Sequence, residues 1–162
     1  MTNAENQIQQ LIEIEAVKQL KARYFRLLDT KQWEELRAIF TDDATFAFGE
    51  DPNDTETVDA VVARWQRTLS SAKTVHHGHT PEIELLGPDR AHGVWAMLDY
   101  VEWPEEDGVR RGVEGHGHYH EDYVKADGEW RIAKLVLTRL RVNGLPQSLA
   151  PFYWKTADTE EE

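Results

Sequence analysis

The chain has 162 residues, of which 40% are hydrophobic and 30% charged, and it contains no cysteine. A chain of this length can bury a core that contains a pocket, and the lack of cysteine excludes disulfides and thiolate metal sites. The formal net charge of −12 argues against nucleic acid and anionic membranes as partners, because phosphate binding requires clustered Lys and Arg.

No targeting or membrane-spanning segment is evident in the sequence. The first ten residues, MTNAENQIQQ, lack a basic flank and an apolar core, and no apolar stretch is long enough to span a bilayer. We therefore expect a cytoplasmic protein with one domain over residues 1–162. Its core should cover residues 6–143, and its acidic tail, 155–162, should be frayed.

Three helices are expected in the first half of the chain. The first runs from residue 4 to 28, because its apolar residues follow the three-and-four spacing of an amphipathic helix. These residues are Ile8, Leu11, Ile12, Val17, Leu20, Tyr24, Leu27 and Leu28. A shorter helix should follow with Asp29 or Thr30 as its N-cap, then a strand over 41–48 and a third helix over 57–69.

The second half of the chain is rich in β-forming residues. The segments GPDR (87–90), PEEDG (104–108) and ADG (126–128) carry turn chemistry and separate the expected strands. Short turns force neighbouring strands to run antiparallel, so we expect a twisted antiparallel sheet. Helices followed by a sheet indicate the α+β class.

Alternation in the strand 92–103 places Asp99 on the same face as the apolar residues Trp95, Met97 and Val101. An isolated buried carboxylate is costly, so Asp99 should have a partner. Arg139 is the candidate, because it shares a face of the last strand with Leu135, Leu137 and Arg141. A purely structural ion pair is the alternative interpretation.

The strand from 109 to 125 separates glycines and tyrosines from histidines. Gly115, Gly117, Tyr119 and Tyr123 lie on the face that we expect to point inward, where glycines leave room for a ligand. His116, His118 and His120 then lie outside, where they could meet another subunit. A metal held by two of them and a histidine of 76–79 is an alternative, although the three span about 13 Å of strand.

Three segments carry a family resemblance. They are KARYFRLLDTKQWEELRAIFTDDATF, TVHHGHTPEIEL and DYVKADGEWRIAKLVLTRLRV. Together they resemble the SnoaL-like family of the nuclear transport factor 2-like superfamily, which includes scytalone dehydratase, bile-acid 7-alpha-dehydratase and a hexachlorocyclohexane dehydrochlorinase. The resemblance covers residues 6 to 143. It implies a cone-like curved sheet packed on a long N-terminal helix and two shorter helices, with a deep apolar pocket, in dimers or trimers.

The resemblance also implies a set of reactive residues. Tyr24, Asp29 and His77 match the positions used in dehydratase-type members, and Asp99 and Arg139 match two pocket residues of the bile-acid enzyme. The extra histidines, His76 and His79, leave the base open between His77 and His79. Plain structural roles remain open as well: an N-cap for Asp29, ordinary core for Tyr24 and a surface position for His77.

These residue types suit proton transfer. The unperturbed pKa of histidine lies near neutrality, and a carboxylate can fix its tautomer while a tyrosine or arginine stabilises developing negative charge. We therefore expect a lyase or isomerase that needs no cofactor or metal and acts on a steroid, terpenoid, polyketide or similar hydrophobic ring. The expected pocket wall consists of Trp65, Trp95, Met97, Tyr119, Leu135 and Leu137. A non-catalytic binding module and a metal-dependent hydrolase or oxygenase are the alternatives.

Overall fold

A computed structural model describes residues 2–48, 51 and 53–144; the acidic tail, 155–162, lies outside this part. The helices are α1 (Asn3–Asp29), α2 (Trp33–Ala38) and α3 (Val58–Leu69). The strands are β1 (Phe40–Ala47), β2 (Glu56–Thr57), β3 (Lys73–Leu85), β4 (Arg90–Glu106), β5 (Val109–Ala126) and β6 (Glu129–Gly144).

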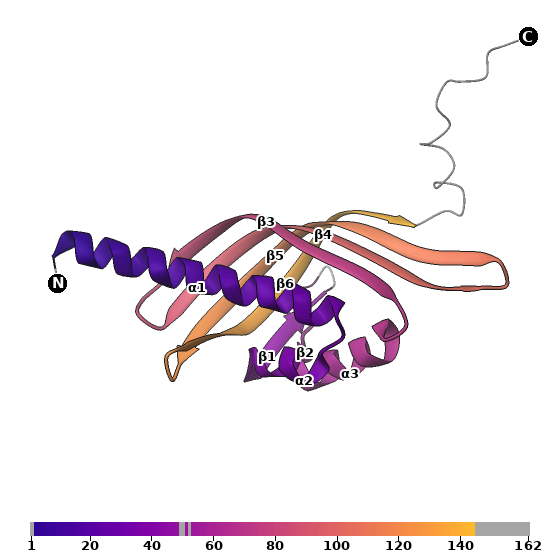
Figure 1. Ribbon diagram of the computed structural model, residues 1–162, viewed down its shortest axis with the longest axis horizontal. Helices are drawn as coiled ribbons and strands as arrows, with labels where there is room; N and C mark the ends of the chain where they lie inside the picture. The colour runs from indigo at the N-terminus through magenta and orange to yellow at the C-terminus, as the bar shows by residue number, and fades with distance from the viewer. Residues whose placement is uncertain (1, 49–50, 52, 145–162) are drawn as a thin grey trace, which may run out of the picture.

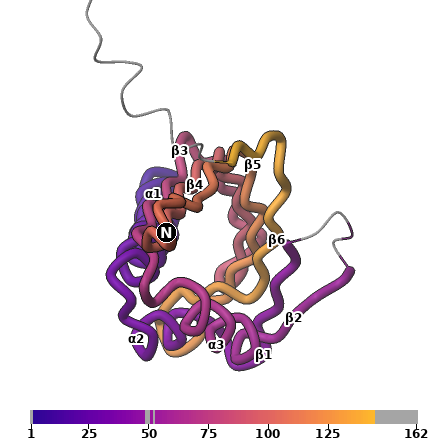
Figure 2. The backbone as a smooth tube through the Cα atoms, turned by 90° about the vertical axis from the view of Figure 1, so that its right-hand side faces the viewer, coloured from indigo at the N-terminus to yellow at the C-terminus, as the bar shows by residue number. Residues whose placement is uncertain are grey.

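The six strands form one curved sheet in the order β2-β1-β6-β5-β4-β3 (Figure 1). The view along the molecule shows the sheet curling round, with α1 beside β3 and with α2 and α3 at the β1 side (Figure 2). The predicted α+β class is therefore confirmed.

One pairing differs from the predicted antiparallel sheet. Strands β3 to β6 pair antiparallel, as the turns require, but β1 runs parallel to β6. Hairpin turns constrain only strands that follow each other directly, whereas β1 and β6 are far apart in the chain. The sheet is consequently mixed at this edge.

Helix α1 begins with a capping box in which the Thr2 hydroxyl accepts from the Glu5 amide and the Glu5 carboxylate accepts from the Thr2 amide. Its buried residues start only at Val17. Ile8, Leu11 and Ile12 keep 58%, 66% and 54% of their surface exposed. The apolar spacing thus predicts the helix correctly, although only its second half packs on the core. Among the described residues no helix has the length and apolarity to cross a membrane.

The prediction that Asp29 or Thr30 caps the second helix is wrong. The amide of Thr30 still donates to the carbonyl of Arg26, so Asp29 is the last residue of α1 and Thr30 is its C-cap. Gln32 precedes α2 as its N-cap. The Asp29 carboxylate is therefore free to reach the sheet.

The inward faces of β4 and β5 match the alternation. Trp95, Met97, Asp99 and Val101 are buried, as are the glycine and tyrosine positions of β5. On β6 the register shifts after Arg139, and Arg141 pairs with His116 of the outer face. Arg141 therefore does not share the inward face of Arg139 as predicted, because a β-bulge inserts an extra residue between them.

Candidate functional site

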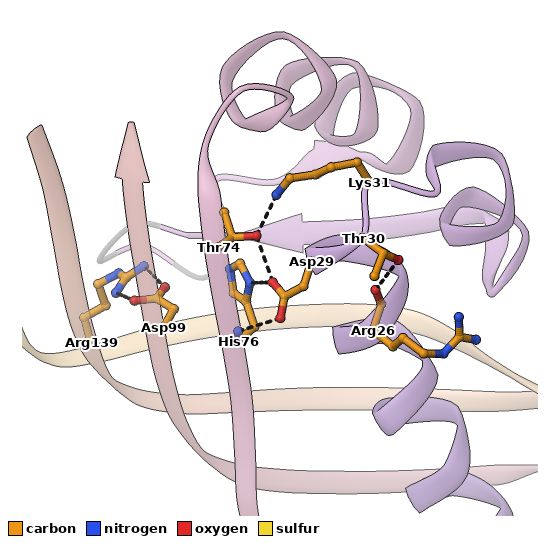
Figure 3. A network of polar contacts seen from close by, with 8 residues as sticks. All are labelled: Arg26, Asp29, Thr30, Lys31, Thr74, His76, Asp99 and Arg139. Atoms are coloured by element: carbon orange, nitrogen blue, oxygen red, sulfur yellow. Dashed lines mark hydrogen bonds and ion pairs between the residues drawn. The ribbon is translucent and has the colours of Figure 1, made fainter. Parts of the chain in front are cut away.

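The end of α1 meets the start of β3 at the carboxylate of Asp29 (Figure 3). Asp29 Oδ1 lies 2.7 Å from His76 Nδ1 and accepts from the Thr74 hydroxyl at 2.9 Å. Asp29 Oδ2 accepts from the backbone amide of His76 at 2.9 Å. Lys31 Nζ donates to the Thr74 hydroxyl at 2.6 Å, and Lys31 itself has a left-handed φ of 62°. This network fixes the helix end to the strand.

The histidine that pairs with Asp29 is His76, not the predicted His77. Along β3, Thr74 and His76 are buried, whereas His77 and His79 are exposed. The register against β4 shifts between His79 and Glu82. Side chains alternate between the two faces of a strand, and Ile83 packs on the core. With regular alternation, His77 and His79 would point inward like Ile83, but the bulge places them on the outer face. A bulge of this kind leaves no clear signal in the sequence.

The environment of Asp29 favours its ionised form. Burial alone would raise the pKa of this carboxyl, but the hydrogen bonds from His76 and Thr74 and the nearby imidazole together hold the pKa below its usual value. An ionised carboxylate can only accept, so the neutral His76 ring carries its proton on Nδ1. Nε2 is then the nitrogen available to the cavity that His76 lines.

This cavity has a volume of about 380 Å³. Its wall combines aromatic and aliphatic side chains with a few polar groups. The lining residues are Tyr24, Leu28, Phe48, Arg64, Trp65, Thr68, Leu69, His76, Asp99, Val101, Trp103, Tyr119, Leu137 and Arg139. A mostly apolar pocket with a few convergent polar groups is typical of a small-molecule site.

The predicted partnership of Asp99 with Arg139 is present in the cavity wall. Arg139 Nη1 and Nη2 donate to the two carboxylate oxygens of Asp99 at 3.0 and 2.6 Å. This bidentate hydrogen bonding raises the pKa of the arginine. Both charges are therefore compensated within the wall.

Gly115 makes this ion pair possible. Asp99 belongs to β4 and Arg139 to β6, with β5 between them, and Gly115 is the residue paired with Asp99. A Cβ at Gly115 would overlap Arg139 Nη1 and Asp99 Oδ1. The glycine inside the strand thus marks space filled by the arginine side chain.

Two buried tyrosines complete the polar part of the cavity. Tyr24 and Tyr119 are each 2% exposed, and their rings meet edge to face at 6.3 Å. Neither hydroxyl is hydrogen-bonded within the part of the chain that the structure describes. Burial raises the pKa of both phenols, so they remain protonated and can donate.

The structure places the six predicted wall residues in two groups. Trp65, Tyr119 and Leu137 line the cavity, whereas Trp95, Met97 and Leu135 lie in the adjoining buried core. Sequence reasoning missed Arg64, which lines the cavity over the Phe48 ring and pairs with Glu56 at 2.7 Å. In the apolar pattern of α3, Arg64 is a polar residue expected on the exposed face, so the sequence gives no indication that it lines the cavity.

A buried ion pair behind the tyrosines was also missed. Lys21 and Glu121 are fully buried and bonded to each other, and the Tyr123 hydroxyl donates to Glu121. Lys21 Nζ lies 3.6 Å from the ring centroid of Tyr119 and 4.1 Å from that of Tyr24. The three-and-four spacing of α1 places Lys21 on the buried face, but a charged side chain is normally expected to be exposed to solvent.

The histidines of β5 lie on the outer face, as predicted. Within residues 2–48, 51 and 53–144, no three His, Asp or Glu side chains lie close enough together to hold a metal ion.

Comparison with known proteins identifies the family. The profile of the SnoaL-like domain matches residues 9–136. The chain belongs to the SnoaL-like family. The probable cyclase FGR4 of Gibberella zeae is 27% identical to this SnoaL-like chain over 134 residues, which are 76% of this chain and 89% of that protein.

Solved structures share the nuclear transport factor 2-like fold of this SnoaL-like protein. A candidate scytalone dehydratase from Novosphingobium aromaticivorans has a TM-score of 0.74 and 24% identity over 83% of this chain and 88% of that one. A hexachlorocyclohexane dehydrochlorinase, LinA type 2, has a TM-score of 0.73 and 19% identity over 87% and 94% of the two chains. The resemblance predicted from the sequence is confirmed for family and fold.

Proposed function

We propose that this protein is a cofactor-independent lyase or isomerase in which His76, oriented by Asp29, transfers a proton on a hydrophobic ring substrate. The observation that carries the proposal is the Asp29–His76 pair at 2.7 Å, together with the place of His76 in the wall of an aromatic-lined cavity. The names of the relatives, a cyclase, a dehydratase and a dehydrochlorinase, support a reaction of this class.

The chemistry begins with a proton next to a carbonyl group. His76 Nε2 accepts this proton from carbon, and the electron pair of the C–H bond forms an enolate whose oxygen accepts a hydrogen bond from Tyr24 or Tyr119. Asp29 stabilises the imidazolium that results. In a dehydration the imidazolium returns its proton to the departing hydroxide, which leaves as water; in an isomerisation the proton goes to another carbon.

The charge balance of the cavity favours an uncharged substrate. Asp99 is paired with Arg139, and Arg64 is paired with Glu56, so neither guanidinium is left to hold a substrate carboxylate. Phe48, Trp65 and Trp103 offer apolar contact instead. A neutral steroid, terpenoid or polyketide ring of moderate size fits these properties.

We further propose that the protein acts as a homo-oligomer.

Proton exchange in heavy water tests the proposal without knowledge of the leaving group. The protein is incubated in D2O with a panel of neutral cyclic ketones, and deuterium uptake next to the carbonyl is measured by mass spectrometry. The wild type should accelerate uptake, and His76→Gln should slow the accelerated rate by about 10²–10⁴-fold. His77→Gln is the matched control; because His77 is exposed and unpaired with Asp29, uptake should stay within about threefold of wild type.

Equal rates for wild type and His76→Gln would remove His76 from this role. If no ketone exchanges but the same ketones quench tryptophan fluorescence on binding, with equal affinity in Asp29→Asn, the protein is a binding module rather than an enzyme.

A further inference from the structure

Helix α1 ends in a Schellman motif with a lysine at the position that normally carries glycine. The amide of Gln32 donates to the carbonyl of Leu27 at 2.9 Å, and the amide of Lys31 donates to the carbonyl of Leu28 at 3.2 Å. The motif requires a left-handed residue directly after the C-cap Thr30, and this residue is Lys31, with a φ of 62°. Glycine adopts this conformation without the steric cost that a Cβ brings. The lysine therefore strains the backbone, and strain of this kind is found at functional sites.

The side chain of Lys31 reaches the sheet (Figure 3). Its Nζ donates to the Thr74 hydroxyl at 2.6 Å, and within the part of the chain that the structure describes it forms no ion pair with a carboxylate. Thr74 is only 8% exposed. Lys31 is half-buried, and burial lowers the pKa of its ammonium group against the attraction of Asp29. The ammonium group is thus partly removed from water, although its bonding partner is an uncharged hydroxyl.

The chemistry of its two neighbours fixes the direction of the Thr74 hydroxyl. An ammonium group can only donate hydrogen bonds, and an ionised carboxylate can only accept them. Between Lys31 Nζ at 2.6 Å and Asp29 Oδ1 at 2.9 Å, the hydroxyl must therefore accept from the lysine and donate to the aspartate. A hydroxyl that accepts from a cation is polarised and becomes a stronger donor. Lys31 consequently acts on Asp29 through Thr74.

The Asp29 oxygen that receives this hydroxyl is the one that faces the imidazole. Oδ1 lies 2.9 Å from the Thr74 hydroxyl and 2.7 Å from His76 Nδ1, and Oδ2 accepts from the backbone amide of His76. Three hydrogen bonds therefore hold the carboxylate in one orientation. The bond from Thr74 is the one of the three that comes from outside the Asp29–His76 pair.

We propose that Lys31 is a positioning residue of this site: its ammonium group orients the Thr74 hydroxyl, which holds the Asp29 carboxylate in place for His76. The inference rests on the proposed function, because it concerns the same pair. Lys31 does not line the cavity, so it acts only through Thr74 and Asp29. Replacement of Lys31 by glycine should therefore relieve the strained turn and at the same time loosen the site.

Lys31→Gly separates this role from a structural one. Glycine suits the left-handed position, so the urea midpoint of unfolding should stay unchanged or rise. The hydrogen bond between Asp29 and His76 should nevertheless weaken. Exchange of the His76 Nδ1 proton with water, measured by nitrogen-15 NMR at pH 7.5, should become about two- to tenfold faster, the effect of losing one hydrogen bond.

Asp127→Gly is the matched control. Asp127 is an exposed residue of the turn between β5 and β6 and also has a left-handed φ, of 53°. Its replacement should relieve the backbone in the same way and leave the His76 exchange rate unchanged.

Two variants of Thr74 test the intermediate step. Thr74→Val removes the hydroxyl and should accelerate the exchange as Lys31→Gly does, whereas Thr74→Ser keeps the hydroxyl and should retain the wild-type rate. With a ketone that takes up deuterium, Lys31→Gly should lower kcat by a similar factor and leave KM unchanged, because Lys31 does not contact the cavity.

An unchanged exchange rate in Lys31→Gly or Thr74→Val, or an equal acceleration in Asp127→Gly, would overturn the proposal. So would a wild-type His76 without a proton on Nδ1. A lowered urea midpoint together with faster exchange in Lys31→Gly would assign Lys31 a structural role instead. The NMR measurement needs no substrate, so a failure of every ketone to exchange would count against the proposed function alone.

Discussion

Lys21 and Asp29 lie on the same face of α1, two helical turns apart, and each bonds to a titratable side chain of the sheet. The Asp29 pair borders the cavity through His76, whereas the Lys21–Glu121 pair is sealed behind Tyr24 and Tyr119. Charges removed from water carry a large desolvation penalty, which mutual attraction offsets only with good geometry. The proposed proton transfer therefore concerns the first pair, which borders the cavity, and the enclosed second pair suits a structural role.

The buried lysine predicts a pH dependence of stability. Burial lowers the pKa of Lys21 from 10.5 to about 8, against the opposing attraction of Glu121. Between these values the unfolded chain binds more protons than the folded one, so the free energy of unfolding should rise with pH from 8 to 10. The contribution of one such group is at most about 1.4 kcal/mol per pH unit.

Urea denaturation at pH 8, 9 and 10 measures this slope. In Lys21→Met/Glu121→Gln the slope should be smaller than in wild type, because the titrating ammonium is gone, while the introduced glutamine side chain can still accept from Tyr123. Identical slopes in the two proteins would show that Lys21 does not titrate in this range.

At the scale of the strand, β5 acts as a spacer across which β4 and β6 interact. Its inward positions Gly115 and Gly117 carry no side chain, and the space above Gly115 is taken by the Asp99–Arg139 pair. A single absent side chain thus allows two strands that are not neighbours to share a buried ion pair. The same strand carries histidines on its other face. Alternate residues of β5 therefore form part of the inner face and part of the outer face of the sheet.

Gly115→Ala should therefore break the Asp99–Arg139 geometry. The new methyl group would overlap both partners, and a small-to-large change of this kind costs about 1–3 kcal/mol of unfolding free energy. Gly144→Ala is the matched control, because a Cβ there meets nothing within 4 Å; its effect should stay within about 0.5 kcal/mol. Equal stability of the two variants in urea denaturation would refute the spacer role.

At the scale of the molecule, the sequence predicts the class, the helices and the inward faces of β4 and β5. Apolar periodicity carries that information, because it reports burial directly. Apolar periodicity does not predict the parallel pairing of β1 with β6, which depends on how the sheet closes. It also does not predict that the first half of α1 is exposed, because this depends on where the sheet ends.

The contacts of the candidate site could also be predicted from the sequence only in part. The pairing of Asp99 with Arg139 follows from two alternating strands, because a buried carboxylate requires a cation on the same face. The partner of Asp29 could not be chosen among adjacent histidines, since the bulge in β3 changes which of them points inward. Bulges and helix ends are local backbone events that side-chain patterns describe poorly.

The central claim is that Asp29 holds His76 with its proton on Nδ1 and leaves Nε2 free to accept another. Nitrogen-15 NMR of the imidazole rings at pH 7.5 tests this directly, because the chemical shifts of the two ring nitrogens distinguish the protonated one. We predict that the neutral form of His76 carries its proton on Nδ1, and that this preference is lost in Asp29→Asn. A neutral His76 protonated at Nε2, or a mixture of the two tautomers, would contradict the account.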